Sequence, residues 1–203
     1  MKNPQRKTRA VHRWLGLVTG VQLLFWCAGG FVFSTHEIEW VRGNHGRDKS
    51  PPATLPPDGI ATSPAKAIAA SGEAFTIDEA QARAIARADR AEQPEVSRAT
   101  LITGHAPVEF RGRDLPAWRV ELADAGNMHV YIDQSTGVIA ARRNDAWRRF
   151  DFFWMLHTMD YSGRDDFNTP WLIGFSVLGL LSVCSGWAIW LFRLVRRPGR
   201  AAA

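Results

Sequence analysis

The sequence predicts an α+β domain, with a helix on a small antiparallel sheet, carried between two transmembrane α-helices. Two apolar stretches, residues 14–33 and 171–195, lie near the two ends of the 203-residue chain. About 20 apolar residues in a helix are enough to cross a hydrocarbon core of about 30 Å. Between the two stretches, one amphipathic helical pattern is followed by segments in which apolar and polar residues alternate. That alternation is typical of a half-buried sheet.

The first apolar stretch, residues 14–33, contains no charged residue and a single amide, Gln22. Residues 1–13 before it carry five basic side chains and no acidic one. A cleaved signal peptide has a similar basic start, but its apolar region is usually shorter and ends at a small-residue cleavage site. We therefore expect an uncleaved anchor with a basic N-terminal segment.

Charge is distributed unevenly around the two apolar stretches. Nine of the 25 Lys and Arg residues lie in residues 1–13 and 193–203, whereas all 20 acidic residues lie between Ser34 and Pro170. Basic flanks stay on the cytoplasmic side of a membrane. Both termini, including the tail 196–203, are therefore expected in the cytoplasm and the middle of the chain outside it. No nucleic-acid partner is expected, because the basic excess lies at the membrane edges and not on a folded domain.

The segment between the spans begins with a linker and continues into the predicted domain. Residues 34–73 contain five prolines within 50–64, which predicts an extended tether. The domain is expected over residues 74–143. Its helix is expected to begin at Thr76 as N-cap, with Glu79 completing a capping box. The predicted apolar stripe of this helix consists of Ala80, Ala84, Ile85 and Ala88.

Strand-like segments follow this helix. They cover residues 98–104, 106–112, 116–123, 128–133 and 138–143. The clearest alternation is shown by Trp118, Val120 and Leu122, and then by Met128, Val130 and Ile132. A turn ending at Gly137 is expected to lead into the last strand. A domain of roughly seventy residues is marginal alone, so we expect it to dock against the membrane part of the chain.

Residues 145–161 return to a helical pattern. One face carries Phe150, Phe153, Trp154, His157 and Tyr161. A helix rich in Trp and Phe just before a span is typical of the membrane interface, so we expect an amphipathic interfacial helix on the outer side.

Three segments together resemble a known family: "VHRWLGLVTGVQLLFW", "AWRVELADAGNMHVYIDQSTGVI" and "WMLHTMDYSG". The chain is similar to PepSY domain proteins with PepSY-associated transmembrane helices. The resemblance implies a bacterial inner-membrane protein whose PepSY domain lies in the periplasm. Larger relatives with more spans include ferric-siderophore reductases, in which membrane histidines ligate b-type haem. This chain has two predicted spans.

The resemblance makes haem b the cofactor to consider, and His157 and His36 the candidate axial ligands. A bis-histidine haem needs two imidazoles facing each other across one iron. His36 and His157 have matching expected depths at the outer membrane face, and His45 is a substitute for His36. His12 is a weaker candidate, because a continuous helix would place it about 36 Å from His36. It would need a second subunit or a different partner, since no histidine follows His157, and the alternative for it is an interfacial anchor. The alternative for His157 is a packed interfacial imidazole without a ligand.

Other chemistry finds little support in the sequence. There is no HExxH, CxxC, GxSxG or phosphate-loop motif, and no catalytic residue or metal site is predicted. Asp165, Asp166 and Asn168 offer cation ligands, but they are more typical of a turn that caps the second span. His105 and His129 are expected at a turn and on a solvent-facing side of the sheet, without a role.

Two function classes remain open. The first is a haem-dependent oxidoreductase of the ferric-reductase type, which passes electrons to periplasmic iron or to a partner. The second is a non-enzymatic anchored domain that binds or regulates a periplasmic partner. The expected partners are the lipid bilayer and either a second copy or a membrane redox protein. Close helix packing, in a hairpin or a dimer, is favoured by the small residues Gly16, Gly20, Ser182 and Gly186.

Overall fold

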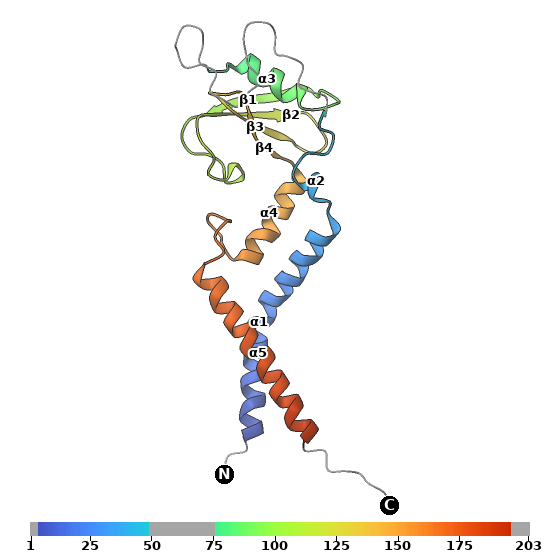
Figure 1. Ribbon diagram of the computed structural model, residues 1–203, viewed down its shortest axis with the longest axis vertical. Helices are drawn as coiled ribbons and strands as arrows, with labels where there is room; N and C mark the ends of the chain where they lie inside the picture. The colour runs from blue at the N-terminus through green and yellow to red at the C-terminus, as the bar shows by residue number, and fades with distance from the viewer. Residues whose placement is uncertain (1–3, 49–75, 196–203) are drawn as a thin grey trace, which may run out of the picture. The chain divides into compact units, whose positions relative to one another are not determined.

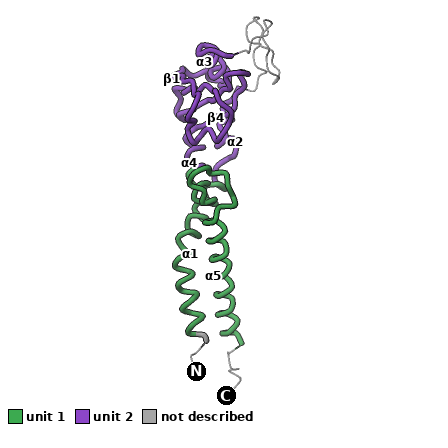
Figure 2. The backbone as a smooth tube through the Cα atoms, turned by 90° about the vertical axis from the view of Figure 1, so that its left-hand side faces the viewer, with its two compact units in different colours: residues 1–34, 152–203 green, residues 35–151 purple. Residues whose placement is uncertain are grey.

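The computed structural model describes residues 4–48 and 76–195, and the expected proline tether lies outside these ranges. The chain divides into two compact units (Figure 2). The first contains residues 1–34 and 152–203, and the second contains residues 35–151. The boundary between them falls within a single helix, α4 (Asp145–Thr158).

Two long helices form most of the first unit. α1 (Pro4–Thr35) and α5 (Pro170–Val195) cross each other in Figure 1 and run alongside each other in Figure 2. Both are long and apolar enough to cross a membrane, and only 17% and 6% of their most apolar windows are buried. Two core helices of a soluble protein would be mostly buried, so the exposed apolar surface supports the two predicted spans.

Gly186 on α5 contributes to the packing of these helices, whereas Gly16 and Gly20 on α1 do not. A Cβ atom added at Gly186 would lie 3.2 Å from Cε1 of His12, so this glycine makes room for the imidazole. At Gly16 and Gly20 an added Cβ would meet nothing within 4 Å. The expectation that these two glycines pack against a neighbouring helix is not met within the described chain.

The second unit is built on a four-stranded antiparallel sheet (Figure 1). Its strands are β1 (Val96–Ile102), β2 (Ala117–Leu122), β3 (His129–Asp133) and β4 (Ile139–Arg143), in the spatial order β1-β2-β3-β4. Val120 lies opposite Ala99 on one side and Val130 on the other. The order is a simple meander in which each strand pairs with its neighbour in the sequence. The predicted α+β class is confirmed.

One face of the sheet is covered by helix α3 (Glu79–Ala88), which closes the main core. The core consists of Ile77, Ala82, Ala86, Val120, Leu122, Met128, Val130 and Ile132. The alternating residues that predicted the sheet are therefore the residues it buries. The turn after β3 is organised by the Asp133 carboxylate, which accepts from the N–H groups of Ser135 and Thr136, and Gly137 follows with a φ of +69°.

Helix α3 begins two residues later than predicted. Its N-cap is Asp78, whose carboxylate accepts from the Gln81 N–H while the Gln81 side chain accepts from the Asp78 N–H. The expected cap, Thr76, does not start the helix, because the Ile77 N–H donates to the Gln134 carbonyl and the Ile77 side chain is buried. Pairing with a residue far along the chain thus overrides the local capping signal.

The buried face of α3 also differs from the predicted stripe. Ala82 and Ala86 are fully buried, and Ile85 packs beside them. Ala80, Ala84 and Ala88, which were expected in the stripe, are exposed. Alanine occurs on both faces of this helix, so its pattern alone could not fix the buried face.

The predicted strand at residues 106–112 is wrong. The segment contains a short 3-10 helix, η1 (Val108–Phe110), followed by Arg111 and Gly112 with φ values of +59° and +60°. Phe110 is fully buried on the sheet face opposite α3, against Tyr131 with ring centres 4.9 Å apart. The apolar residues of this loop therefore fill a second, smaller core and do not extend the sheet.

The compact second unit is larger than the predicted domain 74–143, because the segment after α1 belongs to it. Helix α2 (Ile38–Val41) buries Val41. The Arg90 guanidinium donates to the carbonyls of Gly43 and His45, and Asn144 donates to the Trp40 carbonyl. Residues on both sides of the tether are thus joined into one unit. Helix α4 leaves this unit and ends at Thr158, three residues before the predicted end at 161.

Candidate functional site

His157 lies on the last turn of α4, beside aromatic side chains of α1. The centre of its ring is 6.0 Å from that of Trp26 and 5.9 Å from that of Phe33. Its Nδ1 atom is buried and has no hydrogen-bond partner in the described parts of the chain. The imidazole is therefore held in aromatic surroundings without a polar contact at that nitrogen. These two rings belong to α1, whereas the aromatic face in the sequence prediction lies on the helix of His157 itself.

The end of α4 is fastened to the middle of α1 through its backbone. Gln22 Nε2 donates to the Leu156 carbonyl at 2.9 Å, and Trp26 Nε1 donates to the His157 carbonyl at 3.0 Å. The last carbonyls of a helix have no partner within the helix, and in an apolar environment they need one. The lone amide of the first span thus caps α4, which fixes the position of the His157 backbone against α1.

His12 contacts the second span. Its Nδ1 lies 3.1 Å from the Ser182 carbonyl oxygen and 2.8 Å from Ser185 Oγ. A carbonyl oxygen only accepts, so Nδ1 carries the proton in these contacts and a neutral ring has its lone pair on Nε2. Histidines that ligate metals commonly have this arrangement, in which one ring nitrogen donates to a carbonyl and the other is left for the metal.

His36 and His45 belong to the second unit, whereas His12 and His157 belong to the first. His36 is exposed, and its Nδ1 lies 3.3 Å from Thr35 Oγ1. The pairing of His36 with His157 therefore stays a prediction. His45 stacks on Trp40, with ring centres 3.9 Å apart and an angle of 37° between the rings.

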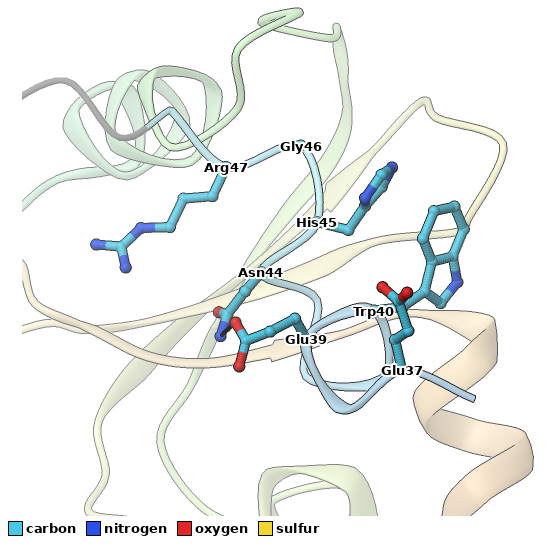
Figure 3. A pocket seen from close by; sticks show the side chains of 7 residues that line it. All are labelled: Glu37, Glu39, Trp40, Asn44, His45, Gly46 and Arg47. Carbon is cyan, nitrogen blue, oxygen red and sulfur yellow. Dashed lines mark hydrogen bonds between the residues drawn. The ribbon is translucent and has the colours of Figure 1, made fainter. Parts of the chain in front are cut away.

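Beside α2 lies a pocket of about 440 Å³ (Figure 3). It is lined by Glu37, Glu39, Trp40, Asn44, His45, Gly46 and Arg47. Figure 3 shows the Trp40–His45 pair beside the Glu37 carboxylate, with Arg47 directed away from it. The Arg90 contacts with Gly43 and His45 hold the loop that forms this pocket. The pocket combines carboxylates with an aromatic pair, a lining that sequence reasoning did not identify as a site.

The acidic turn at residues 160–169 is organised by its first aspartate. The Asp160 carboxylate accepts from the backbone N–H groups of Ser162, Gly163, Asp165 and Asp166. These N–H groups, that of Asp166 first, hold the pKa of Asp160 below its usual value. In the described ranges, no group of three or more acidic, His or Cys residues is placed to hold a metal ion. The alternative prediction, a turn before the second span, agrees with this geometry.

The chain matches the family described as PepSY-associated TM region over residues 9–202. It belongs to this family. No curated protein and no solved structure gives a significant match. The family match and the two exposed apolar helices together indicate a membrane protein. This PepSY-associated protein has two spanning helices with an α+β domain between them.

The PepSY-associated protein also contains a partly buried ionic cluster that sequence reasoning missed. Glu109, on η1, accepts from His129 Nδ1 at 2.7 Å, from the Tyr131 hydroxyl at 2.6 Å and from Arg148 Nε at 2.9 Å. Burial raises the Glu109 pKa, but the hydrogen bonds from His129, Arg148 and Tyr131 outweigh it and lower the pKa to about 2. His129, expected on a solvent-facing side, instead faces this carboxylate. A signal was available, because His129 and Tyr131 alternate on the same face of β3.

Proposed function

We propose that this protein is a b-type haem-binding redox module of the membrane and that His157 supplies an axial ligand. The observation that carries the proposal is the buried Nδ1 of His157, which finds no partner among the described residues. A buried polar atom left without a hydrogen bond costs about 1–3 kcal/mol, so a group from outside the chain at this imidazole would be favoured.

The surroundings of His157 fit a haem. Trp26 and Phe33 provide aromatic contacts on the α1 side, and the capped end of α4 keeps the histidine backbone in place. A bound haem supplies one-electron chemistry, whereas the chain supplies an axial ligand, burial and orientation. In this role the protein serves periplasmic iron reduction, including iron from siderophores, or electron transfer to a partner.

His12 is the second imidazole whose contacts suit a ligand, because its Nδ1 is engaged by Ser182 and Ser185. It cannot share an iron with His157. His12 and Trp26, which contacts His157, are separated by 14 residues of α1, or about 21 Å. His12 would therefore serve a separate iron, completed by a second copy or a membrane redox partner. His36 is the proposed partner of His157 at the outer site.

The test is the visible spectrum of the full-length protein, purified in mild detergent and supplied with haem. We expect a sharp reduced α-band of six-coordinate haem that His157→Ala abolishes or strongly weakens. His105→Ala is the matched control, because His105 is exposed in a loop, whereas His129 is hydrogen-bonded to Glu109. Loss of six-coordination in His36→Ala supports the proposed pair. A colourless wild-type protein after haem addition, or an unchanged band in His157→Ala, contradicts the proposal.

A non-enzymatic role, in which the domain binds or regulates a partner protein outside the membrane, is the second candidate. The pocket beside α2 favours it, because exposed carboxylates and an aromatic pair lie on a loop that Arg90 fixes in place. Partner binding that depends on Glu37, in a protein that takes up no haem, would support this second role over the first.

In either role the protein lies in the bacterial inner membrane, with both termini in the cytoplasm and residues 35–151 in the periplasm. The supporting observation is the basic charge on both flanks and the confinement of all acidic residues to the middle of the chain. A reporter fused after Ala203 should be active only in the cytoplasm, and one inserted within residues 50–64 only in the periplasm. If the second reporter is active in the cytoplasm, the proposed topology is contradicted.

A further inference from the structure

Three arginines gather at the start of α4, in a group called here the arginine cluster: Arg111, Arg113 and Arg143. Two of them lie on the ring of Trp147, with Arg143 Cζ 4.2 Å and Arg111 Cζ 5.5 Å from its centre. Arg143 is only 7% exposed. The cluster thus concentrates positive charge at a partly buried position, where it is poorly screened by water.

One of the three arginines is paired with an acidic side chain in the described chain. Arg111 is paired with Asp151. Among the residues that the structure describes, Arg143 donates to the backbone carbonyls of Glu109 and Arg142, and Arg113 to the carbonyl of Phe110. Within the described chain, neither Arg113 nor Arg143 has a carboxylate ion-pair partner. Buried charges are normally paired, so a nine-tenths-buried guanidinium without an acid is unusual.

Electrostatics at Arg143 support the same reading. Burial, followed by the positive charge of Arg113, lowers the Arg143 pKa to about 10, while the Glu109 charge acts in the opposite direction. The Glu109 carboxylate already accepts hydrogen bonds from His129, Tyr131 and Arg148. The remaining repulsion among the guanidinium groups would be relieved by an anion from outside the chain.

We propose that the arginine cluster binds the phosphate group of an anionic phospholipid. Guanidinium groups match the geometry of phosphate oxygens and bind them through paired hydrogen bonds. The position of the cluster along α4 points to a lipid. Trp147 lies in the first turn of α4, in the segment of the chain that leads into the second span, α5. Tryptophan beside arginine is typical of the headgroup level.

The experiment uses the full-length protein in detergent and follows the thermal unfolding midpoint during lipid titration. The probes are a short-chain phosphatidylglycerol, the matching phosphatidylcholine, and inorganic phosphate. A ligand that binds only the folded protein raises the midpoint in a saturable way. We expect this rise with phosphatidylglycerol and not with phosphatidylcholine or inorganic phosphate.

The deciding variant is Arg113→Ala, because Arg113 is exposed and its removal leaves the packed part of the cluster intact. We expect its apparent affinity for phosphatidylglycerol to fall about tenfold, as for the loss of one charge-assisted hydrogen bond. The affinity of Arg113→Lys should lie between those of the wild type and Arg113→Ala. Arg98 is an exposed arginine on β1, and the affinity of Arg98→Ala should equal that of the wild type. Equal responses to both lipids, or an unchanged affinity in Arg113→Ala, overturn the proposal. If inorganic phosphate raises the unfolding midpoint as much as the lipid does, the site binds free phosphate and the lipid proposal is overturned.

Discussion

Glu109→Ala is expected to lower the free energy of unfolding of the PepSY-associated protein's α+β domain by about 3–5 kcal/mol at neutral pH. The Glu109 side chain is only 16% exposed and accepts from three side chains. Its removal leaves His129 and the Tyr131 hydroxyl without their acceptor and takes one of two acids from Arg148, which keeps Asp145, and breaking such a partly buried ionic network is costly. The thermal midpoint of the full-length protein in detergent, read by circular dichroism, should drop by many degrees.

The same carboxylate predicts a loss of stability in acid. The Glu109 pKa falls from 4.5 to about 2 on folding, so its folded value is depressed. Its contribution is therefore fully present above about pH 4.5–5 and is lost as the pH falls towards 2. That contribution amounts to about 3 kcal/mol.

Glu109→Gln tests this linkage, because it keeps the shape of the side chain but removes the titration. The difference in midpoint between wild type and Glu109→Gln should be large at neutral pH and should shrink as the pH falls below 4. Glu92→Ala, an exposed acid, is the control and should follow the wild type at every pH. A constant difference across the acid range would show that the Glu109 charge does not hold the cluster together.

Asp89→Ala is expected to have a comparable effect, about 3–5 kcal/mol, at the other side of the sheet. Asp89 follows the last residue of α3, is 4% exposed, and accepts from Arg142 Nε at 2.7 Å and from Arg142 Nη2 at 2.5 Å. Arg47 Nε lies 3.6 Å from the same carboxylate. One side chain thus joins the end of α3, the edge strand β4 and the segment that follows α1.

The double variant Asp89→Ala, Arg142→Met should be more stable than Asp89→Ala alone, because it removes the unpaired guanidinium along with its partner. Glu79→Ala is the comparison for an exposed pair. Its bond to Arg83 lies on the helix surface and should contribute about 0.3–0.5 kcal/mol. If Asp89→Ala shifts the thermal midpoint no more than Glu79→Ala does, the Asp89–Arg142 pair does not secure the fold.

Local patterns of hydrophobic and turn residues in the sequence predicted the architecture well. The two spans, the alternating strands β2 and β3 and the turn at Gly137 follow from hydrophobicity and turn chemistry that each segment carries by itself. The predictions that failed depend on contacts with distant residues. Ile77 pairs with Gln134 and delays the start of α3, and Phe110 packs on Tyr131 and turns an expected strand into a loop.

The candidate site was predicted only in part, for the same reason. Helical spacing predicted an aromatic face around His157, but the rings that it contacts, Trp26 and Phe33, lie on α1. The contacts of its backbone with Gln22 and Trp26 could not be predicted, because more than 130 residues separate the partners along the chain. The Glu109 cluster draws on η1, β3 and α4, and no local pattern links these segments.

Helix α4 has a consequence for how this protein tolerates changes in length. Arg148 contacts Glu109 near one end of the helix, the turn carrying His157 is fastened to α1 at the other, and neither glycine nor proline interrupts residues 145–158. Each residue of an α-helix adds about 100° of rotation and 1.5 Å of length. One residue inserted or deleted between Asp151 and Trp154 would therefore rotate the two ends of α4 by about 100° about the helix axis. We expect natural variants to differ in sequence here but to keep the same number of residues, while the tether at residues 50–64 varies in length.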